Sequence, residues 1–228
     1  MLEELKDAVL EANLELPRRN LVIYDWGNVS GIDRDKGLIV IKPKGVPYKK
    51  IKRKYLVVVD FNGKVIEGTC KPSVDTITHL VLYKSFTNIG GIVHTHSQWA
   101  TIWAQACCSI PCFGTTHADN FYGEIPCTEK LTREQIGSDY EQETGNVIVE
   151  RFKMLNPDYI PGVLVASHGP FTWGKDPFEA VHNSVVLEEI AKIAFGNIML
   201  NPEASPISSY LLEKHFFRKH GPKAYFYQ

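Results

Sequence analysis

The chain has 228 residues, a formal net charge of −1 and 44% hydrophobic residues. So balanced a charge provides no global attraction for nucleic acid or for an anionic membrane surface. No segment approaches the ~20 consecutive apolar residues of a membrane-spanning helix. Charges from residue 3 onward argue against a secretory signal. Five cysteines, an odd number without such a signal, favour reduced thiols and a cytoplasmic location.

The N-terminal part predicts a helix followed by strands. Apolar residues recur at three- and four-residue steps over residues 2–16, and Pro17 is expected to end this helix. Strand patterns follow at residues 21–24, 29–32 and 38–41. Residues 56–61 and 64–67 flank Asn62-Gly63, a dipeptide that favours a hairpin with a type I′ turn.

The rest of the chain alternates helices with short apolar runs. Helical patterns are expected at residues 75–87, 98–106, 132–154, 177–195 and 207–219. The helix over 177–195 is long and follows the strand that precedes His168. Gly137 and Gly145 weaken the pattern over 132–154. Residues 109–127 predict short strand pieces with turns. We expect one α/β domain over residues 1–228, with three layers and a mostly antiparallel sheet flanked by helices.

The most informative motif is His94-Thr95-His96, which follows the apolar run Gly90–Val93. On a strand, residues i and i+2 point to the same face, so both imidazoles project together. Such a pair is the beginning of a divalent-metal site. Taken alone, the motif favours two half-buried histidines on a sheet face over a metal site.

Two further residues strengthen the metal interpretation. His168 follows the buried strand pattern Val163–Ser167, and Asp75 directly precedes a helical segment. Three imidazoles and a carboxylate suit a zinc-like ion. An ion with an open position can polarise a carbonyl or activate a water molecule.

Three polar turns are candidates for holding an anion. They lie at residues 26–28, 42–45 and 71–73, and the last one immediately precedes a helix. Backbone N–H groups at turns and helix N-termini favour anions, and lysines add point charges. Any one of these segments alone is simply a turn; together they predict a phosphate site.

Groups that handle protons gather in two further segments. Asp119 ends the run Thr115–Asp119 and could serve as a base if its surroundings raise its pKa, although a capping role is the commoner one. The C-terminal segment places His215, Arg218 and Lys219 within about one helical turn, and carries Tyr225 and Tyr227 beyond Gly221. Either tyrosine can donate a proton.

Together these segments resemble the class II aldolase/epimerase family, and within it the bacterial 4-epimerases of phosphorylated ketopentoses. The resemblance covers nearly the whole chain and is carried by residues 21–30, 40–43, 90–96, 100–106, 114–119, 167–171, 180–183 and 218–221.

The resemblance implies a site for each part of the reaction. Zinc, or else Mn²⁺ or Co²⁺, would be held by Asp75, His94, His96 and His168. The sugar phosphate would be bound by Gly27, Asn28, Lys42, Lys44, Gly45, Ser73 and Val74. Asp119 would exchange one proton, and a C-terminal tyrosine of the adjacent subunit, near His215 and Arg218, would exchange the other. The family forms C4 homotetramers whose active sites lie between subunits.

The implied reaction inverts C4 of L-ribulose 5-phosphate to give D-xylulose 5-phosphate. The C4 hydrogen is not α to the carbonyl and is not acidic enough for simple exchange. Breaking the C3–C4 bond leaves an enediolate on the metal and glycolaldehyde phosphate, and rebonding after rotation of the aldehyde inverts C4. Asp at position 75 favours the epimerase, since the aldolases usually carry Glu there. Arabinose and ascorbate catabolism both use such enzymes.

Three positions depart from the family pattern. Lys44 and Val74 replace serines that would donate to phosphate. Phe226 aligns with the catalytic tyrosine, so Tyr225 or Tyr227 would have to substitute for it. The shared metal chemistry and the missing tyrosine keep open one alternative, a class II aldolase that releases glycolaldehyde phosphate. A second alternative is a non-catalytic interaction module like the adducin head domains, which resemble this fold but lack the four metal ligands that this chain carries.

Overall fold

The computed structural model describes residues 2–221, 224 and 225. Its centre is a seven-stranded sheet in the order β4-β3-β2-β1-β5-β7-β6. All six neighbouring pairs are antiparallel, which confirms the predicted α/β fold with an antiparallel sheet. The strands are β1 (Asn28–Asp33), β2 (Leu38–Ile41), β3 (Val57–Asp60), β4 (Val65–Glu67), β5 (Gly91–His94), β6 (Gly162–Leu164) and β7 (Pro170–Gly174).

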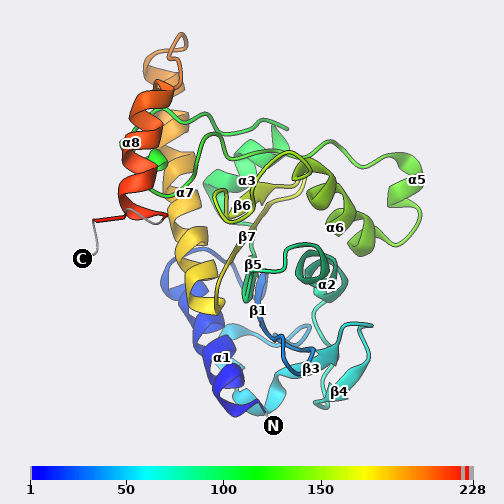
Figure 1. Ribbon diagram of the computed structural model, residues 1–228. Helices are drawn as coiled ribbons and strands as arrows, with labels where there is room; N and C mark the ends of the chain where they lie inside the picture. The colour runs from blue at the N-terminus through cyan, green and yellow to red at the C-terminus, as the bar shows by residue number, and fades with distance from the viewer. Residues whose placement is uncertain (1, 222–223, 226–228) are drawn as a thin grey trace.

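Helices bury both faces of the sheet (Figure 1). The longer helices are α1 (Glu3–Arg18), α2 (Thr76–Ser85), α3 (Gln98–Gln105), α6 (Tyr140–Arg151), α7 (Pro177–Leu200) and α8 (Ser209–Lys219). Val40 packs in a cluster with Val9 of α1, whereas its neighbours Ile39 and Ile41 pack in the larger cluster that contains Leu80 of α2. Alternate residues of one strand therefore face different helical layers, and the strands are apolar on both sides.

Three local expectations for the first 67 residues were wrong. Residues 21–24 form a bend in which Tyr24 has a φ of 54°, not a strand. Helix α1 continues through Pro17 to Arg18, because a proline in the last turn costs a single backbone hydrogen bond. At the β3–β4 hairpin only Gly63 has a positive φ, 78°, and Asp60 accepts from its N–H. The hairpin therefore does not have the two positive φ values that a type I′ turn needs.

The predicted helix over 132–154 is divided in two. A short helix, α5 (Arg133–Ile136), ends at Gly137, and α6 begins after Asp139, whose side chain accepts from the backbone N–H of Gln142. Asp139 is therefore an N-cap that the sequence pattern had placed inside a helix. None of the helices in the described part of the chain has the length and apolarity to cross a membrane.

Helix α8 and the short helix α4 (Thr115–Ala118) contact each other away from the centre of the sheet. In Figure 1, α8 is drawn at the same side of the molecule as the C-terminal half of α7. This arrangement matters for the site, because α4 leads into Asp119 and α8 carries His215 and Arg218.

Candidate functional site

The sheet and its connections bring the three predicted histidines together. His94 ends β5, His96 lies two residues beyond it, and His168 lies in the turn between β6 and β7. One potential ligand atom from each of the three lies within 4.8 Å of the others. The Nε2 atoms of His94 and His96 are 3.2 Å apart. Within the described residues, this histidine triad is the group of side chains whose arrangement suits a metal ion.

The outer nitrogens of two of these rings are engaged elsewhere. Nδ1 of His94 lies 3.0 Å from the carbonyl oxygen of Pro170, and Nδ1 of His168 lies 3.4 Å from the hydroxyl of Tyr140. Their Nε2 atoms are therefore left for the centre of the triad. Hydrogen bonding of the outer ring nitrogen is the usual way in which proteins orient a ligating histidine.

The charge state of the triad also suits a cation. Burial lowers the pKa of His168 to about 3 and that of His96 to about 4, and the neighbouring His94 ring acts in the same direction. Both rings are neutral at pH 7, which is the form that binds metals. The donor set therefore fits a divalent ion of the zinc type.

Asp75 lies next to the triad but is not one of the residues that form it. It is the N-terminal flanking residue of α2, and its Oδ2 accepts hydrogen bonds from Asn28 (2.7 Å) and Ser73 (3.3 Å). Burial alone would raise the pKa of Asp75. His94 and His79 act in the opposite direction, and the resulting pKa is below the usual value. Asp75 is thus an anion beside the triad, although it is not among the residues whose ligand atoms all lie within 4.8 Å of one another.

Two of the predicted phosphate turns lie side by side. The N–H of Lys44 donates to the carbonyl of Lys71 (2.9 Å), and the N–H of Ser73 donates to the carbonyl of Lys42 (3.1 Å). Asn28 joins the third turn to this pair, because its side-chain amide also donates to Oγ of Ser73 (3.1 Å). The structure therefore brings the three turns into one region beside Asp75.

Gly27 and Gly45 serve this region in different ways. A Cβ on Gly27 would lie 2.6 Å from the carbonyl oxygen of His94, and its φ is 84°, so a glycine is needed where the turn approaches β5. Gly45 has a φ of 68°, and a Cβ added there would meet no atom within 4 Å, so its backbone is accessible. Val74 is 47% exposed and Lys44 is exposed, so both can face a ligand.

Lys42 is buried, with 3% of its surface exposed. Its Nζ donates to the carbonyl of Asp25 (3.2 Å) and lies 4.9 Å from the centre of the Tyr48 ring. Burial lowers the pKa of Lys42, while Asp25 and Asp75 oppose that shift. The ammonium group of Lys42 therefore places a positive charge at a fixed position beside these turns.

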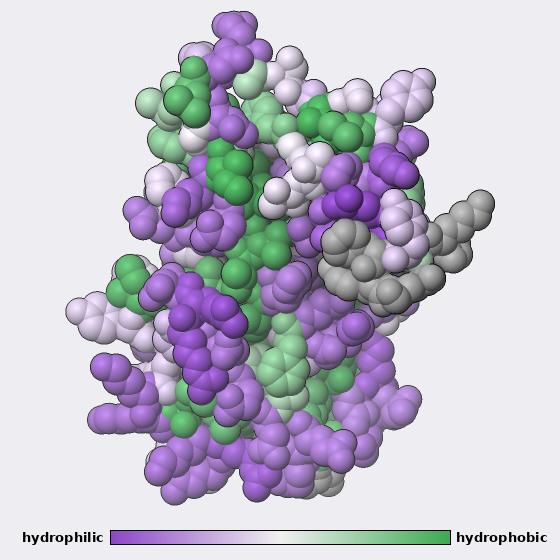
Figure 2. Space-filling view, turned by 90° about the vertical axis from the view of Figure 1, so that its left-hand side faces the viewer, coloured by the Kyte–Doolittle hydropathy of each residue, from purple (hydrophilic) through white to green (hydrophobic). Residues whose placement is uncertain are grey.

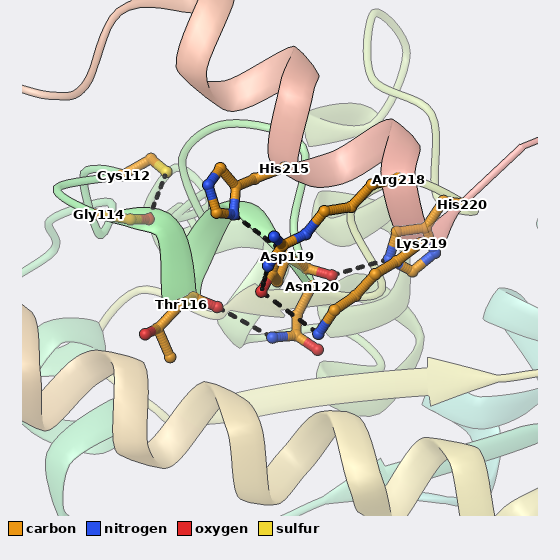
Figure 3. A network of polar contacts seen from close by, with 9 residues as sticks. All are labelled: Cys112, Gly114, Thr116, Asp119, Asn120, His215, Arg218, Lys219 and His220. Carbon is orange, nitrogen blue, oxygen red and sulfur yellow. Dashed lines mark hydrogen bonds and ion pairs between the residues drawn. The ribbon is translucent and has the colours of Figure 1, made fainter. Parts of the chain in front are cut away.

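Asp119 belongs to a second, separate cluster (Figure 3). Its carboxylate accepts from His215 (3.0 Å) and, through both oxygens, from Arg218 (3.1 and 2.8 Å), and Lys219 lies 3.3 Å away. His220 contacts the carbonyl oxygen of Asp119 (2.9 Å). Helix α8 of the same chain therefore surrounds the predicted proton-exchanging residue with basic groups.

The surroundings of Asp119 do not raise its pKa, which was the condition for the predicted role as a base. Burial acts to raise it, but hydrogen bonds from Arg218 and His215 outweigh burial, and the pKa is below the usual value. Asp119 and Lys219 line a cavity of about 540 Å³ to which none of the three triad histidines contributes. The Asp119 cluster and the triad therefore do not line this cavity together.

Of the two predicted C-terminal tyrosines, the structure describes only Tyr225. Tyr225 is half exposed, and its backbone N–H donates to the carbonyl of Arg218 (3.0 Å). Its ring lies 5.8 Å from Nζ of Lys214, so both of these contacts are with α8. Phe226 and Tyr227 lie outside the described residues.

The sequence interpretation missed two features near the triad. One is Tyr140, which contacts His168 from the start of α6. The other is a fully buried chain in which Oγ of Ser30 lies 2.7 Å from Nδ1 of His79 and 2.9 Å from the hydroxyl of Tyr83. The four-residue spacing of Asp75 and His79 on one helix could have indicated the second feature.

The fold is that of the class II aldolases. A solved structure of L-fuculose 1-phosphate aldolase superposes with a TM-score of 0.80, covers 95% of this chain and 96% of its own, and is 24% identical. A structure described as YgbL from Klebsiella pneumoniae, a putative aldolase/epimerase/decarboxylase, superposes with a TM-score of 0.74 at 25% identity, covering 93% and 97% of the two chains.

The family model "Class II Aldolase and Adducin N-terminal domain" matches residues 7–195, and the chain belongs to this family. The chain is also 54% identical, over 227 residues and 100% of both chains, to a protein named L-ribulose-5-phosphate 4-epimerase UlaF from Salmonella paratyphi C (strain RKS4594). The resemblance inferred from the motifs is thereby confirmed.

Proposed function

We propose that the protein is an L-ribulose-5-phosphate 4-epimerase that forms D-xylulose 5-phosphate by breaking and re-forming the C3–C4 bond. The observation that carries the proposal is the convergence of His94, His96 and His168 in a chain that matches a protein of this name along its full length. Asp75, held by Asn28 beside the triad, is the proposed fourth metal ligand.

Each group has a proposed task. A divalent ion at the triad, of which Zn²⁺ is the first choice, would act as a Lewis acid toward the ketose carbonyl and the charge that develops on cleavage. The turns with Gly27, Lys44 and Ser73 would bind the phosphate through N–H groups and hydroxyls. Buried Lys42 would add positive charge to this region.

Proton transfer is proposed for Asp119 and a C-terminal tyrosine. Cleavage requires a base that removes the C4 hydroxyl proton, and re-addition from the other face requires an acid that returns a proton to the new alkoxide. The lowered pKa of Asp119 keeps its carboxylate ionised and able to accept a proton, although the same basic neighbours weaken it as a base. Tyr225 or Tyr227 would be the second group, because Phe226 has no exchangeable proton.

We also propose that the active site is completed by a second copy of the chain in a homotetramer. Asp119 and the triad do not line one cavity together within the chain, which supports this assembly, because both groups are needed at one substrate. Exposed apolar side chains on α7 and α8 provide surface for it: Phe178, Ile193, Phe195, Met199, Leu200, Tyr210, Leu211 and Phe217. Hydrophobic side chains run between hydrophilic ones along this side of the molecule (Figure 2). The proposal includes a single domain over residues 1–228 and a cytoplasmic location.

The test is incubation of the purified protein with L-ribulose 5-phosphate after chelation and after Zn²⁺, Mn²⁺ or Co²⁺ is added back. Formation of D-xylulose 5-phosphate that depends on the added metal is expected. Accumulation of free dihydroxyacetone and glycolaldehyde phosphate would instead favour an aldolase. A metal-loaded protein that forms neither product would overturn the proposal. Tyr225→Phe and Tyr227→Phe, compared in the same assay, identify the tyrosine that exchanges a proton.

A further inference from the structure

We propose that Tyr140 is a positioning residue for His168, so that the start of α6 sets the geometry of the metal site; the inference rests on the metal site of the proposed function. The hydroxyl of Tyr140 lies 3.4 Å from Nδ1 of His168, and the two rings have centroids 6.2 Å apart. Because a metal-binding imidazole carries its proton on the other nitrogen, His168 would donate to the Tyr140 oxygen.

The contact completes a pattern among the ligands. His94 has its outer nitrogen fixed by the carbonyl of Pro170, a backbone group that a substitution cannot remove. His168 depends on a side chain for the same purpose. It also lies in a turn in which the preceding residue, Ser167, has a φ of 63°. Its ring therefore needs an external partner more than the ring of His94, which lies on a strand and stacks on Phe171 with centroids 4.1 Å apart.

The backbone that presents Tyr140 is itself held in place. The carbonyl of Tyr140 accepts from Oγ1 of Thr144 (2.8 Å), and the next carbonyl, that of Glu141, accepts from Oγ1 of Thr78 (2.7 Å). Thr78 belongs to α2 and follows Asp75 by three residues. The first turn of α6 is therefore hydrogen-bonded to α2, the helix that directly follows Asp75.

Close packing reinforces this bond between the two helices. A Cβ at Gly145 of α6 would lie 2.6 Å from Cβ of Val81 of α2, so the helices approach each other at a distance that only glycine permits. Asp75 at the start of α2 and Tyr140 at the start of α6 thus reach the triad from one rigid pair of helices. We infer that this pair sets the position of His168 relative to Asp75.

The experiment compares Tyr140→Phe with wild type by Co²⁺ binding, followed by visible absorption and by competition with a chromogenic chelator. The ring remains and only the hydroxyl is lost, so the midpoint of thermal unfolding of the metal-free protein should not change. We expect roughly tenfold weaker Co²⁺ binding and an altered absorption band, as for loss of other hydrogen bonds behind metal ligands. Tyr55→Phe, which removes a hydroxyl far along the chain from α6 and the triad, is the matched control and should match wild type.

Thr78→Val extends the test to the connection between the helices. It removes the hydrogen bond to Glu141 and keeps the side-chain shape, so a smaller loss of Co²⁺ affinity in the same direction is expected. Equal Co²⁺ affinity and an identical spectrum for Tyr140→Phe and wild type would overturn the inference. The readout does not use the sugar phosphate. Absence of epimerase activity in a wild-type protein that binds Co²⁺ would count against the proposed function alone.

Discussion

The side-chain amide of Asn28 donates a hydrogen bond of 2.7 Å to Oδ2 of Asp75. Asn28 begins β1 and is paired in register with His94 at the end of β5. One residue therefore links the sheet strand that carries a triad histidine to the carboxylate that precedes α2. The Oδ1 atom of Asn28 is buried and has no hydrogen-bond partner among the described residues, so the amide is held by its donor side.

Replacement of Asn28 by alanine is expected to weaken metal binding. Asp75 would lose its shortest hydrogen bond and could rotate away from the triad, as happens when other hydrogen bonds behind metal ligands are removed. Equilibrium dialysis against Zn²⁺ should give an affinity lower by a factor of about 10 to 100. Asn146→Ala, on the exposed side of α6, serves as control. A wild-type affinity for Asn28→Ala would show that Asp75 does not depend on this bond.

His96→Asn tests the triad directly. The change removes a nitrogen that lies 3.2 Å from the corresponding atom of His94, and the shorter amide cannot reach the same point. Metal content after purification and the rate of epimerisation should fall together, because the same side chain supports both. Elemental analysis of wild type and variant purified in parallel checks this. Unchanged metal content in the variant would remove His96 from the site.

Asp119→Asn tests whether the site is shared between subunits. The amide cannot act as a base at neutral pH, so turnover should fall steeply while the metal content stays at the wild-type level, because Asp119 lies outside the triad. Asp119→Asn and His96→Asn are then unfolded, mixed in equal amounts and refolded. In a cyclic assembly with sites between neighbours, about a quarter of the sites would combine an intact triad with an intact Asp119.

Recovery of activity in the mixture, from two variants that are inactive alone, is the expected result of this complementation. A mixture as inactive as its parents would mean that each chain builds its site alone. Mixing Asp119→Asn with wild type in the same way provides the reference for losses during refolding.

The sequence predicted the ligand-bearing elements because periodicity and motif fall together there. The apolar run before His94 is a strand, and the pattern before His168 ends at a strand and a turn. What it missed depends on contacts between distant segments. Nothing local to Tyr140 indicates that it meets His168, because the contact follows from the packing of α6 on α2. The same holds for the pKa of Asp119, which basic groups almost 100 residues later in the chain lower.

The fold should lose stability in mild acid through buried His117. Burial lowers its pKa to about 4, whereas an imidazole in an unfolded chain has a pKa near 6.5. Below about pH 6.5 the unfolded chain therefore binds a proton that the native state excludes, and stability falls until the pH reaches about 4. The slope for one such group is up to about 1.4 kcal/mol per pH unit. His117→Asn should show a flatter dependence between pH 6.5 and 5 in urea unfolding; an unchanged slope would contradict the assignment.

Gly145→Ala should destabilise the protein, although alanine is the better helix former. In an unobstructed helix the exchange gains up to about 1 kcal/mol. Here the added Cβ would lie 2.6 Å from Cβ and 2.8 Å from Cγ1 of Val81, and neither helix can move without disturbing the hydrogen bond from Thr78 to Glu141. Overpacking of this kind costs about 1–3 kcal/mol, so we expect a net loss in the free energy of unfolding.

The chain offers a matched control at Gly196 in α7, where an added Cβ meets no atom within 4 Å. Gly196→Ala should raise the free energy of unfolding by about 0.5–1 kcal/mol. The double variant Gly145→Ala/Val81→Ala makes room for the new methyl group and should regain part of what Gly145→Ala loses. Urea unfolding of the four proteins gives the comparison. A stabilising Gly145→Ala would mean that α2 and α6 are not closely packed at this point, and the rigid pairing of Asp75 with Tyr140 would lose its support.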